Sequence, residues 1–418
     1  MNAPAKFPPL RALDDALAQL LAQVQPLQDT QTVSTFDADR RVLAHSITCA
    51  MQVPGFDNSA MDGYAVRSAD CTVPATLKVA QRIAAGQFGQ PLHSGQAARI
   101  FTGAPMPPGA DAVVMQEDCT DLGDGTVRIN TTPRSGQWLR RAGEDIAHGA
   151  VVLEQGTLLS PALLGLAASI GMATLEVTRH VKVALFSTGD ELVMPGDVLP
   201  HAMPPGAIYN SNRFFLRALL QRAGCEVTDM GIVPDNRQAT IAALQTAAAE
   251  HDLILTSGGV SVGEEDHIKP SVQQLGSLDL WSISMKPGKP FAYGKVHRAG
   301  VAADAAHFVG LPGNPVSSFV TFLMLVRPML AALQGQPRQA SAIKTVAYRA
   351  DFTWPKADKR REFLRVKRNA SGGLDVYPNQ SSGVLTSTVW ADGLLDNPAG
   401  STIAQGDMVT FIPFDQLL

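Results

Sequence analysis

The sequence predicts a multidomain α/β protein: a central, doubly wound α/β domain with a mainly β module, a small helical linker subdomain and a C-terminal β-barrel. Three observations support this fold class. The 418 residues exceed what one hydrophobic core normally organises. Strand and helix patterns alternate over residues 181–335, as in parallel strands joined by helices. Short strand patterns interrupted by Gly and Pro fill residues 51–148 and 336–418.

Two helices are expected in the small subdomain, which we assign to residues 1–50 plus 149–180. Apolar residues recur at helical spacing near the N-terminus, at Leu10, Leu13, Leu17, Leu20 and Val24. This stripe is expected to cover the protein's own core, with a subunit interface as the alternative. Ser160-Pro161 and Gly171 bracket a second, short helix, because these residues suit the N-cap, the first turn and the C-cap.

The two β regions are recognised by their turns. Asp124-Gly125 before Thr126–Ile129 predicts a hairpin within the β module of residues 51–148. After Gln336-Pro337, short strands continue to the C-terminus and predict a small barrel or sandwich over residues 336–418.

The alternation of strand and helix patterns is clearest in the central domain, residues 181–335. Buried strands are expected at residues 181–186, 225–232, 252–256 and 308–309. Helices are expected at residues 213–223, 235–249 and 315–333, and Asp235 is a good N-cap for the second of them.

Composition excludes several classes of function. Lys plus Arg number 34 and Asp plus Glu number 38, so the net charge of -4 argues against a nucleic-acid binder and a polybasic membrane-surface protein. The four cysteines form no C-x-x-C pair, and the N-terminus lacks the apolar core of a signal peptide. The most apolar stretch, residues 319–326, is too short to cross a bilayer. We expect a reduced, cytoplasmic protein without membrane or nucleic-acid partners.

Three loops rich in Gly and hydroxyl groups follow the predicted strands, at residues 187–191, 256–263 and 310–317. Ligands of open α/β sheets bind at this carboxyl edge, where backbone N–H groups suit phosphate or another oxyanion. Any one of these loops could be only a tight turn, but three together favour a site. The dinucleotide and P-loop fingerprints do not follow the first strand.

Fixed lysines and several acids accompany these loops. In Lys286-Pro287-Gly288-Lys289-Pro290, the prolines and the glycine stiffen the backbone and so fix the positions of two lysines, which form a candidate binding site for a polyanion. The alternative is a pair of solvated surface lysines, which is the usual case for a lone lysine pair. Carboxylates beside phosphate binders are suitable ligands for Mg²⁺. The candidate acids are Asp190, Glu191, Asp235, Glu264 and Asp266 at the sheet edge, and Asp62 and Asp145 in Gly-containing turns of the β module. Helix capping and helix-dipole stabilisation are the alternatives for Asp235 and for Asp190 with Glu191.

Seven motifs occur in an order that resembles the MoeA type of molybdopterin molybdenumtransferase, a family related to the E domain of gephyrin. They lie at residues 57–66, 102–105, 141–146, 187–192, 257–263, 286–290 and 311–315. The resemblance implies an enzyme of molybdenum cofactor biosynthesis. Such an enzyme inserts molybdate into adenylylated molybdopterin, hydrolyses the adenylate with Mg²⁺ and releases molybdenum cofactor and AMP.

The resemblance also implies partners. It implies a homodimer in which the β module of the second subunit completes each active site. The expected substrate donor is a molybdopterin adenylyltransferase, and the expected acceptors are molybdoenzyme apoproteins or their chaperones.

Site residues follow from the same resemblance. The implied catalytic set is Asp62, Thr102, Asp145, Asp190, Glu191, Asp235, Asp266 and Lys286. Asp190, Glu191, Asp235 and Asp266 are the implied Mg²⁺ ligands. The implied substrate-binding set is Ser257, Gly258, Gly259, Ser261, Lys289, Pro312, Pro315, Ser317, Arg361 and Ser382, in which Lys289, Ser317, Arg361 and Ser382 form the molybdate pocket. Two alternatives stay open: a non-catalytic molybdopterin-binding scaffold of the same fold, and an unrelated nucleotide-binding α/β enzyme.

Overall fold

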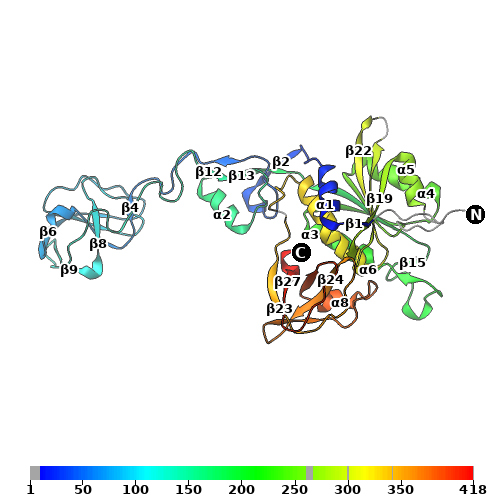
Figure 1. Ribbon diagram of the computed structural model, residues 1–418. Helices are drawn as coiled ribbons and strands as arrows, with labels where there is room; N and C mark the ends of the chain where they lie inside the picture. Colours follow the sequence, from blue (N-terminus) through cyan, green and yellow to red (C-terminus); the bar gives the residue numbers. More distant parts are fainter. Residues whose placement is uncertain (1–9, 260–266, 299–300, 341, 418) are drawn as a thin grey trace, which may run out of the picture.

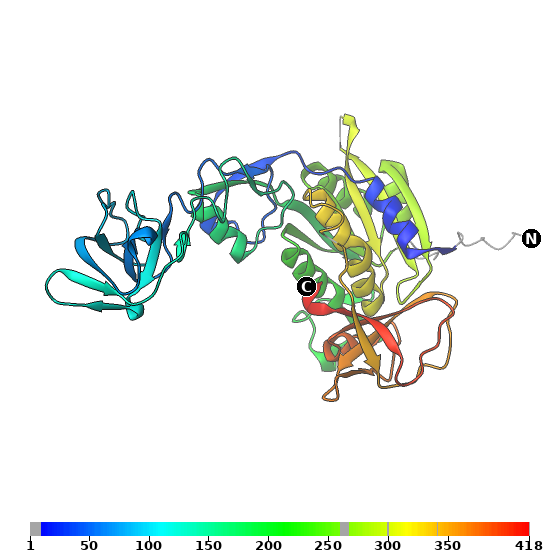
Figure 2. The same ribbon diagram turned by 60° about the vertical axis from the view of Figure 1, so that its left-hand side comes forward.

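The chain is elongated, with most of its mass at one end. The computed structural model describes residues 10–259, 267–298, 301–340 and 342–417. Figure 1 shows the β module at the far end of an extended connection, followed by the small subdomain and then by the central domain. The C-terminal barrel lies beneath the central domain, and Figure 2 shows the β module well apart from both of them.

A seven-stranded sheet, in the order β1-β19-β21-β22-β18-β14-β17, forms the central domain. Its strands are β1 (Leu10–Arg11), β14 (Val181–Thr188), β17 (Cys225–Val233), β18 (Leu253–Ser257), β19 (Gly276–Ile283), β21 (Pro290–Arg298) and β22 (Val301–Leu311). The four predicted strands, β14, β17, β18 and β22, are parallel as expected, whereas β21, which was not predicted, runs antiparallel to β19 and β22. Its connections to both neighbours are too short for a helical crossover, so the chain reverses there.

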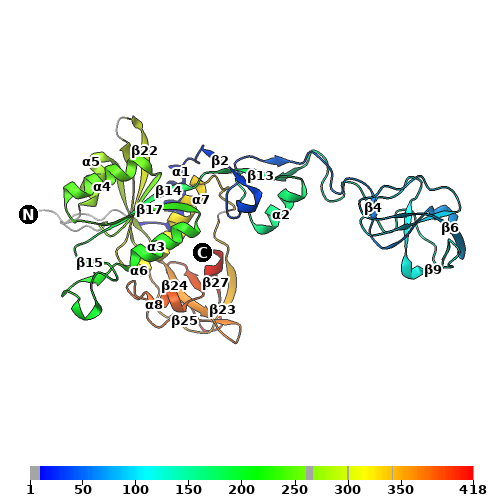
Figure 3. The same ribbon diagram turned by 180° about the vertical axis from the view of Figure 1, so that it is seen from behind.

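Helices cover both faces of this sheet, which confirms the doubly wound architecture. Side chains of β14 alternate between the faces: Val183 and Leu185 join the core beneath α1, α3 and the long helix, whereas Phe186 joins the core beneath α4 and α5. The helices are α1 (Leu13–Ala22), α3 (Ser211–Arg222), α4 (Arg237–Glu250) and α5 (Ile268–Leu275). Seen from behind in Figure 3, α3 runs beside β17.

The long apolar helix is present but interrupted. It consists of α6 (Pro315–Thr321), a π-helical segment (Phe322–Val326) and α7 (Arg327–Leu333). Pro328 explains the interruption, since it cannot donate the regular i→i−4 hydrogen bond and its ring disturbs the preceding turn. Pro315–Leu333 is long and apolar enough to span a membrane, but 89% of its most apolar window is buried inside the protein. It is therefore the core helix of the central domain.

The N-terminal helix packs on the protein's own core, as expected, although it begins later than the apolar stripe suggested. Leu10 lies in β1 and pairs with Ser282 of β19, so the helical stripe starts at Leu13. Leu13 and Leu20 are buried in the core shared with α3 and the long helix. These contacts attach α1 to the central domain.

The small subdomain and the β module lie along the extended part of the chain. The subdomain contains α2 (Pro161–Ser169), the β2–β13 pair (Thr30–Ser34 with Thr174–Thr178) and the β3–β12 pair (Ile47–Thr48 with Val151–Leu153). The module's sheet has the order β8-β5-β7-β6-β10-β9. Its strands are β5 (Gly63–Val66), β6 (Ala75–Ile83), β7 (Gln96–Ile100), β8 (Ala112–Met115), β9 (Cys119–Asp121) and β10 (Thr126–Ile129), and the predicted hairpin at Asp124-Gly125 joins β9 to β10. A further pair, β4 (Asn58–Ser59) with β11 (Leu139–Arg140), adjoins this sheet.

The C-terminal domain is a closed barrel. Its strands are β23 (Val346–Ala350), β24 (Arg361–Arg368), β25 (Gly373–Val376), β26 (Gly393–Asn397) and β27 (Met408–Pro413), and β24 closes the barrel by pairing with both β25 and β26. The short helix α8 (Thr386–Trp390) contacts β24. β20 (Met285–Lys286) adds to β24 from the central domain and joins the two domains by main-chain pairing.

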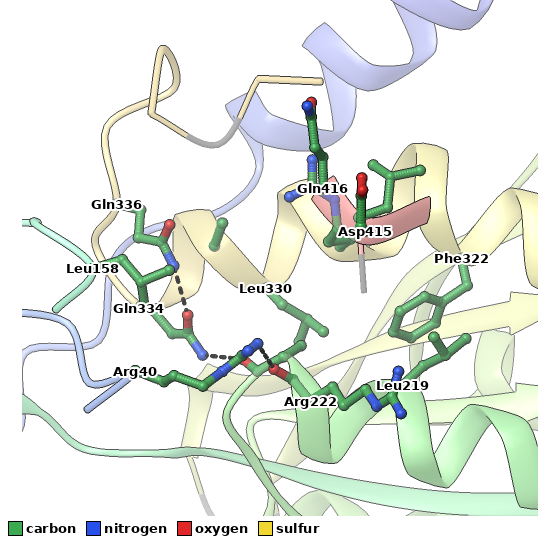
Figure 4. A pocket seen from close by; sticks show the side chains of 14 residues that line it. Arg40, Leu158, Leu219, Arg222, Phe322, Leu330, Gln334, Gln336, Asp415 and Gln416 are labelled. Atoms are coloured by element: carbon green, nitrogen blue, oxygen red, sulfur yellow. Dashed lines mark hydrogen bonds between the residues drawn. The ribbon is translucent and has the colours of Figure 1, made fainter. Parts of the chain in front are cut away.

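A cavity of about 220 Å³ marks the joint between the small subdomain, the central domain and the C-terminus. Figure 4 shows Arg40 of the small subdomain donating to the carbonyl of Arg222, and Gln334 donating to the carbonyl of Ala223. Both groups satisfy carbonyls at the C-terminal end of α3, which helices leave unpaired. Of the predicted site residues that the structure describes, none lines this cavity.

Candidate functional site

The larger cleft, of about 670 Å³, lies at the carboxyl ends of β14, β18 and β22. All three predicted Gly-rich loops contribute to its wall. The predicted site residues that line it are Glu191, Ser257, Gly258, Gly259, Pro312, Pro315 and Ser317. Gly383 of the barrel also lines it, so the cleft lies between two domains.

Two glycines let the backbone form the floor of this cleft. Gly258 and Gly259 have φ angles of +93° and +65°, in the left-handed region that favours glycine. A Cβ atom on Gly259 would lie 2.7 Å from Cγ1 of Ile268 and 2.9 Å from Oγ1 of Thr188. The loop therefore needs glycine for both conformation and space, and both glycines line the cleft.

The acids follow two neighbouring strands. Thr188 of β14 pairs with Val233 of β17, so Asp190 and Asp235 each lie two residues beyond paired strand ends. Glu191 lines the cleft. This placement brings oxygen ligands to the predicted edge.

One sequence assignment is wrong at this edge. The helix α4 begins at Arg237, and its N-cap is Asn236, whose side chain accepts a hydrogen bond from the Ala239 amide at 2.9 Å. Asp235 therefore does not cap the helix, and capping no longer accounts for its presence.

Three of the four predicted Mg²⁺ ligands, Asp190, Glu191 and Asp235, lie among the described residues. Asp266, Ser261 and Glu264 lie outside the described residues. Among the residues that are described, no three Asp, Glu, His or Cys side chains gather as a metal site. Mg²⁺ commonly uses only one or two protein carboxylates with phosphate and water. The chemistry of Asp190, Glu191 and Asp235 is thus compatible with Mg²⁺ held jointly with a phosphorylated substrate.

The two lysines of the stiff loop have different surroundings. Nζ of Lys286 donates to Oε1 of Glu362 at 2.9 Å and lies 3.3 Å from Asp358, and both of these acids belong to the C-terminal domain. Burial lowers the pKa of Lys286, but the hydrogen bonds and charges of Glu362 and Asp358 outweigh burial and raise it overall. Lys286 therefore links the two domains. Lys289 precedes Pro290, which lines the cleft.

Arg361 is held by carboxylates. Its guanidinium makes two hydrogen bonds to Asp396, at 2.7 and 2.6 Å, and a third to Asp14 at 3.0 Å. These contacts raise its pKa. Ser382 lies closer to the cleft, since its carbonyl accepts the Val316 amide at 3.0 Å and the next residue, Gly383, lines the cleft.

The remaining predicted residues lie in the β module, at the other end of the molecule (Figure 1). The backbone amide and hydroxyl of Thr102 both donate to Oδ1 of Asp62 at 2.8 Å, and these bonds lower the pKa of Asp62. Asp145 lies in the same part of the chain, where its amide donates to the carbonyl of Val53. One chain does not bring these three residues to its own cleft.

Sequence reasoning missed two asparagines that line the cleft at the start of α3. Asn210 caps this helix by accepting the Arg213 amide at 3.2 Å, and Asn212 donates to the Gly313 carbonyl at 2.7 Å. Asn212 thereby fixes the third Gly-rich loop. The run Asn210-Ser211-Asn212 before the helical pattern is the signal that could have revealed them.

Comparisons with known proteins agree with this arrangement along the chain. Three family models match in order: the MoeA N-terminal region (domain I and II) at residues 11–171, a probable molybdopterin binding domain at residues 184–332, and the MoeA C-terminal region (domain IV) at residues 347–414.

Full-length relatives and solved structures are similar as well. The chain is 41% identical to a molybdopterin molybdenumtransferase of Haemophilus influenzae, covering 97% of this chain and 99% of the relative. It is 38% identical to one of Nostoc sp., covering 95% and 91%. A crystal structure of the molybdopterin biosynthesis MoeA protein of Pyrococcus horikoshii superposes with a TM-score of 0.83 at 26% identity, covering 97% of this chain and 100% of that one.

Proposed function

We propose, from the premise that this chain belongs to the MoeA family, that it acts as a molybdopterin molybdenumtransferase in molybdenum cofactor biosynthesis. In detail, we propose that the enzyme inserts molybdate into adenylylated molybdopterin, hydrolyses the adenylate and releases molybdenum cofactor and AMP. The observation that carries this proposal is the cleft where three Gly-rich loops of the sheet meet one loop of the barrel.

The loops would bind the phosphate-bearing part of molybdopterin. Gly258 and Gly259 expose main-chain groups at the cleft floor, and Ser257 and Ser317 add hydroxyl groups to its wall. Neutral donors of this kind hold phosphate oxygens in a fixed geometry. Ser261 is proposed to belong to the same set.

The acids would hold Mg²⁺ against the phosphoanhydride. Asp190, Glu191, Asp235 and Asp266 are the proposed ligands, with substrate phosphate and water completing the shell. When bound, Mg²⁺ supplies Lewis-acid polarisation of a phosphoryl oxygen. The four carboxylates themselves would orient the phosphoanhydride and position the attacking oxygen atom in line with it.

Molybdate would lie on the barrel side of the cleft. Lys289, Ser317 and Ser382 are the proposed ligands, and Lys286 supports them from the joint with the barrel. Positioned donors stabilise an oxyanion through a reaction because they need not reorganise. Arg361 would join this set only by releasing Asp396 or Asp14.

A homodimer would complete the site. The helix α2 is apolar on all sides yet only partly covered, and Phe36 beside it is 96% exposed, so this subdomain offers a surface for self-association. Asp62, Thr102 and Asp145 of one chain would then reach the cleft of the second chain. The same proposal includes a cytoplasmic location, a molybdopterin adenylyltransferase as donor, and molybdoenzyme apoproteins or chaperones as acceptors.

The test is anaerobic incubation with adenylylated molybdopterin, MgCl₂ and molybdate, followed by quantification of AMP. Molybdate-dependent AMP release supports the transferase reaction. Tight binding of adenylylated molybdopterin without AMP release would instead favour a scaffold.

A further inference from the structure

Two arginines lie side by side on the β module. Arg82 of β6 and Arg99 of β7 are paired positions of neighbouring strands, and the next pair, Ile83 with Ile100, is buried in the core on the opposite face. Like charges at paired positions destabilise a sheet. In the part of the chain that the structure describes, neither arginine forms an ion pair with an acid. The stability of the sheet therefore does not explain why both charges lie here.

One aromatic ring orients both guanidinium groups. The Cζ atoms of Arg82 and Arg99 lie 4.5 and 4.8 Å from the centre of the Phe101 ring. Arg99 is held further, because it donates to the Gly63 carbonyl at 3.0 Å and to Oε1 of Gln116 at 2.7 Å. A guanidinium that stacks on a ring keeps N–H groups at its edge, where phosphate oxygens can accept from them. Arg82 is exposed to solvent, so the pair presents oriented donors at the surface of the module.

Two predicted site residues lie at the same place on the module. Phe101 is followed directly by Thr102, whose amide and hydroxyl both donate to Asp62. These two hydrogen bonds lower the pKa of Asp62, and the positive charge of Arg99 acts in the same direction. Arg99 is thus close enough to Asp62 for their charges to interact. A ligand that reaches Asp62 and Thr102 also comes within the influence of Arg99.

The cleft of the central domain offers little positive charge of its own. Glu191 is the only ionised side chain among the residues that line the cleft in the described chain. The phosphoanhydride of adenylylated molybdopterin carries negative charge on both of its phosphoryl groups. Main-chain amides and hydroxyl groups bind phosphate oxygens but bring no full positive charge. Arginine supplies that charge together with paired donors that match phosphate geometry.

We infer that Arg99 and Arg82 of one chain bind the phosphoanhydride of the substrate that lies in the cleft of the second chain. Arg99 donates to a phosphate oxygen beside Asp62 and Thr102, and Arg82 adds a second charge from the neighbouring strand. The Phe101 ring holds both groups in advance, so they need not reorganise as charge develops on the phosphate. This inference rests on the proposed function, and in particular on a site shared between two subunits.

The experiment measures how AMP release depends on the concentration of adenylylated molybdopterin in Arg99→Gln, Arg99→Lys, Arg82→Gln and a control, Arg128→Gln. Arg128 lies on β10 of the same sheet and is exposed, and its neighbours Val127 and Ile129 are buried, so it points away from the module core. We expect the substrate KM to rise at least about tenfold in Arg99→Gln and about threefold in Arg82→Gln. Arg99→Lys should recover part of the loss because it keeps the charge. Arg128→Gln should stay within about twofold of the wild type.

A purely structural role for the stacked arginines gives a different pattern. It lowers the thermal stability of the glutamine variants and leaves their substrate KM unchanged, and that result overturns the inference. Should Arg99→Gln fail to fold, Arg82→Gln still decides, because the exposed Arg82 side chain contacts the Phe101 ring and makes no hydrogen bond within the described chain. An unchanged KM in Arg82→Gln then overturns the inference.

Subunit exchange tests the assignment to the second chain. Arg99→Gln chains are mixed with Glu191→Gln chains, and AMP release is measured at a substrate concentration well below the KM of Arg99→Gln. The mixed dimer joins the intact cleft of the Arg99 variant to the intact module of the Glu191 variant, so AMP release should rise after exchange. No rise overturns the assignment.

A binding measurement separates this inference from the proposed function. Titration calorimetry with inorganic pyrophosphate and Mg²⁺ requires no turnover. The affinity for pyrophosphate should fall at least about tenfold in Arg99→Gln and stay within about twofold in Arg128→Gln. Equal affinities in the wild type and Arg99→Gln overturn the arginine site. If the wild type binds pyrophosphate through Arg99 but releases no AMP, the proposed function has failed and the arginine site stands.

Discussion

Replacing Lys286 by Met should loosen the joint between the central domain and the barrel. The ammonium of Lys286 lies 2.9 Å from Glu362, whose side chain is 1% exposed, and 3.3 Å from Asp358. Glu362 also accepts from Trp354 at 3.0 Å and from Asn397 at 3.4 Å. Among the described residues, the substitution leaves the buried Glu362 carboxylate with only neutral hydrogen-bond partners.

The size of the expected stability loss at this joint follows from these contacts. Removing one partner of a fully buried ion pair costs about 3–5 kcal/mol. The Lys286 side chain is 39% exposed, so solvent screens part of the interaction, and Trp354 and Asn397 still satisfy Glu362. We therefore expect a loss of about 2 kcal/mol, which corresponds to roughly thirtyfold faster local opening.

Hydrogen exchange is the suitable assay, because a chain of several domains need not unfold in one transition. Amides of β20 and β24 should exchange about thirtyfold faster in Lys286→Met, whereas Lys182→Met, at an exposed position of the central sheet, should leave them unchanged. A double variant with Glu362→Gln should recover stability, since the unpaired charge is then gone. Acceleration below about twofold in Lys286→Met would refute the reasoning.

The same contacts also determine how the stabilisation by the Lys286–Glu362 ion pair changes with pH. The pKa of Lys286 is raised from 10.5, so the contribution of this pair is complete below that pH and is lost as pH rises through the raised value. Protection of β20 and β24, corrected for intrinsic exchange, should therefore be constant at neutral pH and decline in strong alkali.

Three further predictions concern single positions. Asp235→Asn should abolish AMP release without changing the midpoint of thermal unfolding. Asn236→Ala should keep AMP release but lower the free energy of unfolding by about 1 kcal/mol, as measured by thermal denaturation. The opposite pattern would return the capping role to Asp235. Gly259→Ala should weaken the binding of adenylylated molybdopterin at least about tenfold in fluorescence titrations, because the new Cβ atom would lie 2.7 Å from Cγ1 of Ile268. An unchanged affinity would contradict the role given to this loop. Burial raises the pKa of Cys225 to about 12, so native protein at pH 8 should resist iodoacetamide at this thiol until it is denatured, as followed by mass spectrometry; rapid labelling would contradict that burial.

The sequence was informative where a local pattern determines the outcome. The loops after β14, β18 and β22 were located because a strand pattern followed by glycine and hydroxyl residues marks the ligand edge of a parallel sheet. The long helix was located by its apolar length, and the hairpin at Asp124-Gly125 by its turn residues. In each case, residues close in the chain carry the whole signal.

The sequence was uninformative where partners lie far apart in the chain. Nothing near Arg361 indicates that Asp396 and Asp14 hold its guanidinium. The antiparallel strand β21 was not predicted, and its direction depends on pairing with β19 and β22. Two acceptable N-caps stood side by side at the start of α4, and composition alone could not choose Asn236 over Asp235.

The separation of the β module from the cleft leads to a last prediction, on how two subunits share one site. If the module of one chain completes the cleft of the other, Asp62→Asn and Glu191→Gln inactivate different halves of each composite site. Both homodimers should be inactive. A mixed dimer, however, pairs the intact cleft of the first variant with the intact module of the second, and so contains one complete site out of two.

Random exchange of equal amounts makes half of the dimers mixed, so AMP release should recover to about one quarter of the wild-type rate per subunit. The control is the same mixture before subunits exchange, which should stay inactive, and sedimentation should show dimers throughout. Cis assembly of the site would leave the exchanged mixture inactive, because every chain then carries a defect in its own site. Recovery therefore distinguishes a site shared between subunits from one that forms by a large swing of the module within a single chain.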